Sequence, residues 1–361
     1  MRRIVVVGVL LALASWSLGA GAAQGQTPYY AGKTIEIIVP FGPGGGTDIE
    51  SRFFAPFFEK HIAGNPKVLV RNMPGGGSIL GANFYAQNAK PDGTQILATS
   101  GSTVIPFMLG VPQVRYDFAQ WKLIKVNGVG GVIYVSPKTG VKTAADLLKP
   151  GEKLVYGGIS ATALDLTVLL LFEILGLDVR SVMGFEGRGP ARLAFERGET
   201  NIDYQTTPAY LTQVVPLVSE GKAVPVMSMG FVNDRGQMLR DPAAPDLPTP
   251  YDVFQTLHQR KPDGLIRWKA YQSMVAAGFA FQKALWVPKA TPPEAVTALL
   301  ESIDKMGRDP QFRALSRNVL EGYTVFRGDR LEPAVLRSMR MTLDVNRYIL
   351  NLLQTKYNVR F

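Results

Sequence analysis

Apolar runs of strand length alternate with helix-like periodic segments through the first two thirds of the chain, and this alternation constrains the fold more than any other feature. It predicts parallel sheets covered by helices, the α/β class. In such sheets ligands bind beyond the carboxyl ends of the strands, where loops lead into helix N-termini. Strands are predicted at 34–39, 67–71, 94–99, 132–136, 153–157, 179–183 and 223–229, and helices at about 48–62, 78–88, 144–148, 163–175, 190–198 and 208–220.

The last third of the chain has a different character. A proline-rich connector, "DPAAPDLPTP" (241–250), precedes one more strand-like run, "AFQKALWVP" (280–288), and three amphipathic helical patterns. We therefore expect two α/β lobes, the first of which is completed by a C-terminal helical part. The predicted boundaries place the first lobe at 27–127, the second at 128–231, and the return to the first lobe with the C-terminal helices at 232–361.

The N-terminus has the pattern of a signal peptide, predicted over 1–23. A short basic start, "MRR", precedes a 16-residue apolar run and then the small residues of "AGAAQGQ", with cleavage expected after Ala22 or Ala23. The apolar run is marginal for spanning a bilayer, which needs ~20 residues, so an uncleaved anchor is the less favoured alternative. We expect a mature protein that is soluble and exported.

Composition excludes several classes of site. The chain has no cysteine, which rules out disulfides, thiol nucleophiles and thiolate metal ligands. The formal charge is +10, or +8 without Arg2 and Arg3, but lysine and arginine are scattered rather than clustered with aromatic residues. We therefore expect no nucleic-acid partner. A positive field that attracts small acidic molecules is a secondary interpretation.

The first glycine-rich turn, "FGPGGGTD" (41–48), follows a predicted strand and precedes a predicted helix. A phosphate-binding Walker A loop needs Lys-Ser/Thr after the glycines, and a dinucleotide fingerprint needs a third glycine later than Gly46. What remains is either a tight structural turn or a set of free N–H groups that can hold a carboxylate. The candidate ligand-binding residues here are Gly44, Gly45, Gly46, Thr47 and Asp48.

A second turn, "MPGGGS", repeats this arrangement after the next strand, and "TSGS" follows a third. Turns at the ends of neighbouring strands can face one cleft, and this recurrence favours a ligand site over a purely structural turn. The candidates in these two turns are Gly75, Gly76, Gly77, Ser78, Ser100 and Gly101.

The second lobe offers partners for these loops. Arg188, between two glycines, is a candidate bidentate clamp for a carboxylate, and the alternative is an exposed arginine that pairs with Glu186. The other candidates lie at predicted strand ends or helix starts: Ser160, Thr162, Gly187, Gly189, Gln205 and Thr206.

Catalytic and metal sites are not expected. His61 and His258 are the only histidines, neither lies near an activated serine motif, and no G-x-S-x-G elbow occurs. Asp48 and Glu50 are two residues apart and do not share a helix face. We predict no enzyme activity, no metal and no cofactor; an exported hydrolase or lyase remains the alternative from another class.

Three segments together resemble a known family. "KTIEIIVPFGPGGGTDIESR", "VLVRNMPGGGSILGA" and "KPDGTQIL" look like the periplasmic substrate-binding proteins of tripartite tricarboxylate transporters, the Bug/TctC family. "LVYGGIS", the "GxxPA" helix start and "PDLPTP" continue the match, which extends from about Gly32 to the C-terminal helices.

The resemblance implies a type II periplasmic-binding-protein fold, a Venus flytrap whose two lobes close on a small organic acid. It further implies that backbone N–H groups and bridging waters of the first-lobe loops hold a ligand carboxylate. The protein is then expected in the periplasm, as a monomer, delivering ligand to a membrane permease or, alternatively, to a sensory partner.

The chain departs from the family pattern in three places. Phe185-Glu186-Gly187 replaces a common Tyr-Lys-Gly and is followed by Arg188, and Gln205 replaces a frequent acidic residue. The segment 253–281, with Trp268 and Tyr271, is longer than usual. It either lines the mouth of the cleft or forms a surface helix, and the surface helix is favoured.

Overall fold

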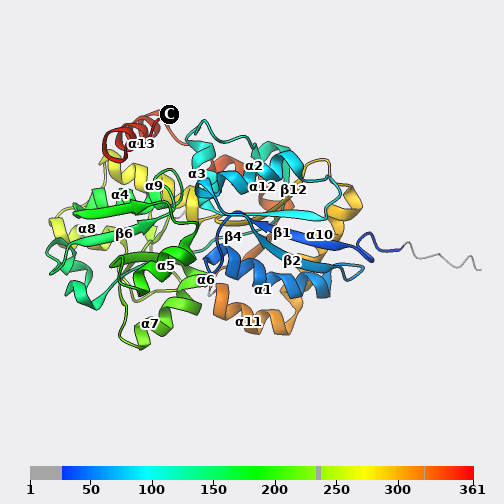
Figure 1. Cartoon of the computed structure of the whole chain (residues 1–361), viewed down its shortest axis with the longest axis horizontal. Helices are drawn as coiled ribbons and strands as arrows, with labels where there is room; N and C mark the ends of the chain where they lie inside the picture. The colour runs from blue at the N-terminus through cyan, green and yellow to red at the C-terminus, as the bar shows by residue number, and fades with distance from the viewer. Residues whose placement is uncertain (1–26, 233–236, 321) are drawn as a thin grey trace, which may run out of the picture.

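The computed structural model describes residues 27–232, 237–320 and 322–361, which form two lobes side by side (Figure 1). The predicted signal peptide lies outside these residues. In the part of the chain that is described, no helix is both long enough and apolar enough to cross a bilayer.

The first lobe is built on a six-stranded mixed sheet with the order β13-β4-β12-β3-β1-β2. Strands β1, β2 and β3 are parallel, whereas β12 runs antiparallel to both β3 and β4. The strands are β1 (Thr34–Val39), β2 (Lys67–Asn72), β3 (Gln95–Thr99), β4 (Trp121–Asn127), β12 (Lys283–Pro288) and β13 (Val325–Arg327).

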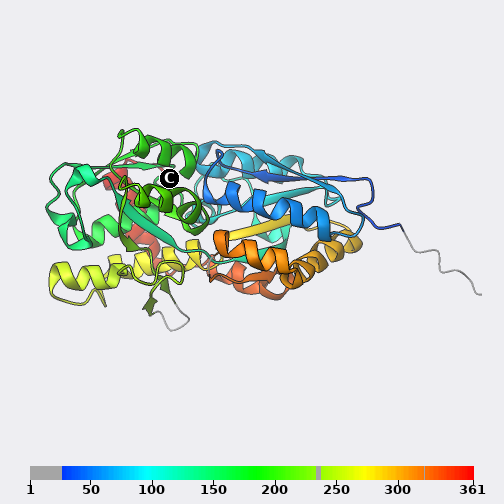
Figure 2. The same cartoon turned by 90° about the horizontal axis from the view of Figure 1, so that it is seen from below.

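Helices cover both faces of this sheet, and each face has its own hydrophobic cluster. On one face the phenylalanines of α1 contact Phe312 of α11, and Figure 2 shows α10 and α11 beside α1. The helices are α1 (Gly46–His61), α2 (Ile79–Asn88), α3 (Gly101–Met108), α10 (Pro293–Arg308), α11 (Pro310–Leu320) and α12 (Gly328–Ser338), with 3-10 turns at Gly76–Ser78 and Phe118–Gln120.

The second lobe is built on a five-stranded sheet with the order β7-β6-β8-β5-β9, in which β5 is antiparallel to both of its neighbours. Its strands are β5 (Gly131–Val135), β6 (Leu154–Gly158), β7 (Val179–Met183), β8 (Ile202–Thr206) and β9 (Val224–Ser228). A small hairpin of β10 (Phe231–Val232) and β11 (Met238–Leu239) follows.

The helices of this lobe include three from the last third of the chain. They are α4 (Asp165–Leu175), α5 (Arg188–Glu196), α6 (Thr207–Ala209), α7 (Val215–Ser219), α8 (Pro250–His258), α9 (Ile266–Phe279) and α13 (Leu343–Tyr357), with a π-helical turn at Tyr210–Val214 and 3-10 turns at Pro137–Thr139 and Ala144–Leu148.

The α/β class and the two lobes are confirmed, and the predicted strand 34–39 coincides with β1. Strand β4 was not among the predicted strands. Its sequence, "WKLIKVN", carries two lysines and does not read as an apolar run, yet Lys125 is buried in the lobe. The hydrophobic pattern fails here because a buried charge has a partner elsewhere in the fold.

The predicted return of 232–361 to the first lobe needs correction. Helices α8, α9 and α13 pack with α4 of the second lobe in the largest hydrophobic cluster, which also takes in Ile79 and Ile105 of the first lobe (Figure 1). Trp268 and Tyr271 of α9 are fully buried, so segment 253–281 is not a surface helix. Helix α9 packs against α3, α4 and α13.

Candidate functional site

A small polar cavity lies between the two lobes. Its volume, about 20 Å³ for the centres of water molecules, is room for about one water. The ends of four elements line it. They are the start of α1 and the start of β12 in the first lobe, and the start of α5 and the end of β8 in the second. Six of the predicted site residues line it: Gly45, Gly46, Thr47, Ser100, Arg188 and Thr206.

The first glycine-rich turn presents the N-terminus of α1 to this cavity. Gly44 adopts φ +76°, a conformation that favours glycine, and its N–H donates to Asp48 Oδ2 at 2.9 Å. Helix α1 starts at Gly46 without a side-chain cap. The N–H groups of its first turn have no acceptor within the helix, and the positive end of the helix dipole favours an anion there.

Asp48 does not serve the cavity. Its carboxylate accepts hydrogen bonds from Gly44 N, from Arg52 Nε at 2.9 Å and from Asn72 Nδ2 at 3.0 Å. The side chain is buried behind the loop that it holds in shape. These partners favour a role of Asp48 in bracing the loop over the predicted contact with ligand.

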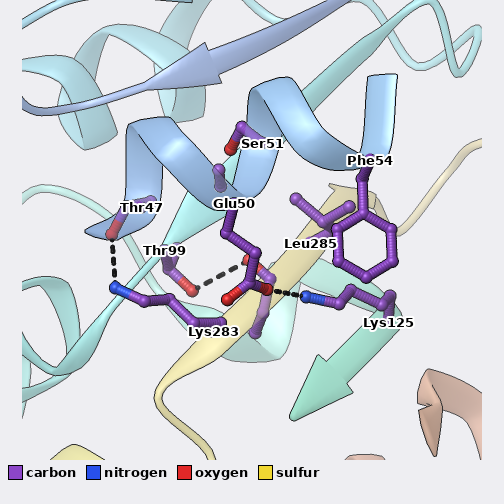
Figure 3. Close-up of a pocket in the computed structure, with 10 residues that line it drawn as sticks. Thr47, Glu50, Ser51, Phe54, Thr99, Lys125, Lys283 and Leu285 are labelled. Atoms are coloured by element: carbon purple, nitrogen blue, oxygen red, sulfur yellow. Dashed lines mark hydrogen bonds and ion pairs between the residues drawn. The ribbon is translucent and has the colours of Figure 1, made fainter. Parts of the chain in front are cut away.

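Lys283, which the sequence did not single out, lines the cavity from the start of β12. Its side chain is buried, and Nζ donates to Thr47 Oγ1 at 2.8 Å. Figure 3 shows the lysine reaching up to the first turn of α1. Burial removes hydration from the ammonium and lowers the pKa of Lys283 to about 7, against a smaller raising effect of Glu50.

On the other side of Glu50 lies a second buried lysine, whose charge is matched. Lys125 on β4 forms an ion pair with Glu50 of α1 and lies 4.3 Å from the centre of the Phe54 ring (Figure 3). Burial still lowers the pKa of Lys125, although Glu50 opposes this shift. Because Glu50 is engaged by Lys125, no carboxylate of the described residues pairs with Lys283.

Two further side chains at the cavity have buried polar atoms that find no hydrogen-bond partner among the described residues. They are the hydroxyl of Thr206, at the end of β8, and both amide atoms of Gln282. The Thr206 hydroxyl lies close to the start of α1, because a Cβ atom added to Gly46 would overlap it. The same Cβ would lie 3.5 Å from Lys283 Nζ. Buried polar atoms are rarely left unpaired, so this set points to a polar ligand or ordered water.

Arg188 lines the cavity, but its guanidinium is engaged inside the second lobe. Nε donates to Tyr204 O at 3.2 Å, Nη1 to Gly157 O at 2.8 Å, and the two terminal nitrogens pair with Asp165 and Asp203. Burial alone would lower the pKa of Arg188, yet the surrounding tyrosines and Asp165 raise it above its usual value. The exposed pair with Glu186 is therefore wrong, and these internal partners favour a structural role for Arg188 over the predicted carboxylate clamp.

Gln205 lies behind Arg188 instead of in the cavity. Its Nε2 donates to Arg188 O at 2.7 Å and to Asp203 Oδ2 at 3.2 Å, so it fixes the start of α5. Gln205 Oε1 has no partner among the described residues.

Gly187 and Gly189 make contact between the lobes. Gly42 N donates to Glu186 O at 2.8 Å across the cleft. A Cβ at Gly189 would overlap Pro43 O, and a Cβ at Gly187 would lie 3.1 Å from Gly42 N. These glycines let the two loops pack backbone against backbone, so the two lobes are in direct contact here.

The second glycine-rich turn faces a larger neighbouring chamber of about 490 Å³. Ile159 lines both the small cavity and this chamber, so the two adjoin. Five predicted site residues line the chamber: Gly75, Gly76, Gly77, Ser160 and Thr162. The Ser160 and Thr162 hydroxyls are 3.0 Å apart, and Asp165 accepts from the N–H groups of Ile159 and Ser160, which leaves these two N–H groups unavailable to a ligand.

The remaining predicted residues support the walls. Ser78 is buried at φ 92° and donates to Ser102 O at 3.0 Å. Ser100 caps α3 by accepting from Ser102 N, and Ser102 Oγ accepts from Leu164 N of the other lobe at 3.2 Å. A Cβ at Gly101 would lie 2.7 Å from Leu164 Cδ1, so this glycine serves close packing between the lobes.

Both histidines lie away from the cavity. His61 contacts Asp309 at 2.7 Å, and His258 contacts Leu175 O at 3.2 Å. Among the residues that the structure describes, no group of three or more histidines and carboxylates could hold a metal ion.

Sequence reasoning missed Gln282 and Lys283. The available signal was a Gln-Lys pair inside "AFQKALWVP", an otherwise apolar strand, where burying a lysine requires a counter-group or a use. What the sequence could not show is that this strand begins beside the first turn of α1, 236 residues earlier.

The two-lobed fold, with a cavity between the lobes, is that of periplasmic binding proteins. The chain aligns with the periplasmic binding protein BugD at a TM-score of 0.67, with 20% identity over 90% of this chain and 98% of that one. MatC from Rhodopseudomonas palustris with bound malate aligns at 0.63, with 21% identity over 88% and 97%. A second R. palustris protein, with adipate, aligns at 0.62, with 20% identity over 90% and 97%.

Sequence comparison points to one group of these proteins. A UPF0065 protein of Bordetella pertussis strain Tohama I is 29% identical over 310 residues, 84% of this chain and 82% of that protein. Protein BugT of the same strain is 27% identical over 224 residues, 59% of this chain and 65% of BugT, slightly less than two thirds of its length. No protein-family model matches the chain. The resemblance to the Bug/TctC binding proteins is confirmed by these relatives.

Proposed function

We propose that this protein is an exported solute-binding protein that captures a small carboxylate-bearing organic acid between its lobes. One observation carries the proposal. The first turn of α1, the buried ammonium of Lys283 and the atoms of Thr206 and Gln282 without partners among the described residues meet at one interlobe cavity. A helix N-terminus, an ammonium and side-chain donors suit an anion with oxygen atoms.

The proposed mechanism is a ligand-dependent closure. The small cavity has room for about one water, so in the closed arrangement it takes only the carboxylate end of an acid, and the rest of the ligand lies in the adjoining chamber. Entry of the acid requires the lobes to separate. Contacts such as Gly42 with Glu186 and Ser102 with Leu164 then join the lobes in the closed arrangement. Because the ligand contacts both lobes only when they are closed, it shifts an existing equilibrium toward closure. No covalent chemistry is required.

The similar proteins support this class of ligand. The structures that align with the chain include one with malate and one with adipate, both dicarboxylates. We further propose delivery to the permease of a tripartite tricarboxylate-type transporter, since the sequence resembles the binding subunits of such systems. A receptor in a sensory system is the alternative partner. Export rests on the predicted signal peptide.

A thermal-shift screen of the protein from residue 24 onward tests the proposal. The panel contains acetate, succinate, malate, adipate, citrate and benzoate, with matching methyl esters to detect hydrolysis. A ligand that binds only the folded state at a hundredfold excess over Kd stabilises by about 2.7 kcal/mol, so a bound acid raises the melting temperature. No shift with any acid would contradict the proposal, and turnover of an ester would favour a hydrolase.

A pair of loop variants locates the site. Gly45→Val brings a branched side chain against Gly189 and Arg188, and Gly76→Val forces a branched residue into φ +57°. We expect both to lose affinity for the acid found in the screen. Unchanged affinity in both would place the site elsewhere.

A further inference from the structure

Lys283 is a buried cation that forms no ion pair with any carboxylate of the described residues, since the nearby Glu50 pairs with Lys125. Its side chain is 4% exposed, and its hydrogen-bond acceptor is the neutral hydroxyl of Thr47. The charged groups that face it are Glu50 on α1, Lys125 on β4 and, across the cavity, Arg188 on α5. Glu50 pairs with Lys125, and Arg188 pairs with Asp165 and Asp203. A buried ammonium without a paired anion is costly, so its retention calls for an anion.

We propose that Lys283 is the ion-pairing residue of the ligand site: its ammonium binds the ligand carboxylate directly at the first turn of α1. This inference rests on the proposed function and specifies it. It requires a negative charge on the end of the ligand that lies beside Lys283. Thr47 Oγ1, which now accepts from Lys283, is free to donate its own proton to the same carboxylate.

The position of the ammonium favours a direct pair over an electrostatic effect at a distance. Lys283 lines the same cavity as Gly45, Gly46 and Thr47, and a Cβ on Gly46 would lie 3.5 Å from Nζ. A carboxylate that accepts N–H bonds from this turn therefore lies within reach of Nζ. Closure excludes water from the pair, and low local dielectric strengthens it.

The pair also links binding to protonation. Burial holds the pKa of Lys283 at about 7 before ligand enters. A bound carboxylate favours the charged form and raises this pKa, so binding above pH 7 takes up a proton. We expect about one proton per ligand at pH 8 and much less at pH 6, and affinity that falls as the pH rises above 7.

The test uses calorimetry with the tightest-binding acid of the panel above, in buffers of different ionisation enthalpy at pH 6 and pH 8. Lys283→Met removes the charge at similar volume, Lys283→Arg keeps a permanent charge, and Lys289→Met removes an exposed lysine from the end of the same strand segment as a control for net charge. We expect Lys283→Met to lose about 10- to 100-fold in affinity and Lys289→Met to change it less than twofold.

Lys283→Arg is expected to bind without proton uptake, because arginine does not titrate in this range. Equal affinity of wild type and Lys283→Met, or binding to the wild type without proton uptake at pH 8, would overturn the assignment of Lys283 while leaving the proposed function intact. Failure of the wild type to bind any acid of the panel would overturn both. Since proton uptake is measured on the wild type, the test holds even if a variant fails to fold.

Discussion

Two buried cations line the same cavity from opposite lobes, and they differ in how their charge is balanced. Arg188 of the second lobe donates to two carboxylates, two backbone carbonyls and a tyrosine hydroxyl. Lys283 of the first lobe donates to one neutral hydroxyl. A cation near a cleft is therefore a ligand group only if the protein leaves its charge unmatched. By this criterion Arg188 stabilises its lobe, and Lys283 is the residue expected to bind the ligand anion.

The largest expected effect is a loss of stability on replacing Arg188, which distinguishes a structural role from a ligand clamp. Arg188→Met leaves Asp165 and Asp203 buried without their shared cation, and breaking a buried pair costs about 3–5 kcal/mol of unfolding free energy. Urea denaturation measures this loss. Arg197→Met, which removes an exposed arginine beside Glu199, is the control and should cost less than about 1 kcal/mol. A stable Arg188→Met variant with weakened ligand affinity would instead restore the carboxylate clamp.

A smaller effect tests whether ligand binding needs close contact between the two lobes at Gly189. Gly189→Ala places a methyl group against Pro43 O and Gly45 N, and overpacking of this kind costs about 1–3 kcal/mol. We expect about tenfold weaker ligand binding by calorimetry, with proton uptake by Lys283 retained. Gly307→Ala, where nothing lies within 4 Å, is the matched control. Unchanged affinity in Gly189→Ala would show that the first lobe binds ligand without closure.

A third effect concerns pH and the unliganded protein. The pKa of Lys283 is about 7 in the folded state and ~10.4 in an unfolded chain, so the unfolded chain holds more protons between these values. The unfolding free energy of the wild type should therefore rise from pH 7 to pH 9 relative to Lys283→Met, by about 1 kcal/mol per pH unit. Denaturant titrations at both pH values measure it. A constant difference would mean that Lys283 keeps its proton when unliganded.

Much of the fold follows from local pattern, because alternating apolar and periodic segments determine strands such as β1 and helices such as α1. Strand β4 escaped prediction because Lys125 is buried against Glu50, a pairing across 75 residues. The lobe of α8, α9 and α13 was not predicted either, because the apolar face of a helix does not indicate which sheet the helix will cover.

The site was predictable where backbone geometry decides it and not where long-range pairing does. The glycine-rich turn marked the start of α1 as a place for an anion, and Gly45, Gly46 and Thr47 line the cavity. Arg188 resembled a clamp because its neighbours in sequence are glycines. Its carboxylate partners lie 23 and 15 residues away, on α4 and β8. Lys283 is identified by the absence of such partners among the described residues, which only the folded arrangement reveals.

A crystal structure with the acid found in the screen tests the account most directly. We expect one carboxylate of the ligand to lie within hydrogen-bond distance of the N–H groups of Gly46 and Thr47 and of Lys283 Nζ, with both lobes closed around it. Electron density for the acid confined to the larger chamber, with Lys283 still donating to Thr47, would contradict the account.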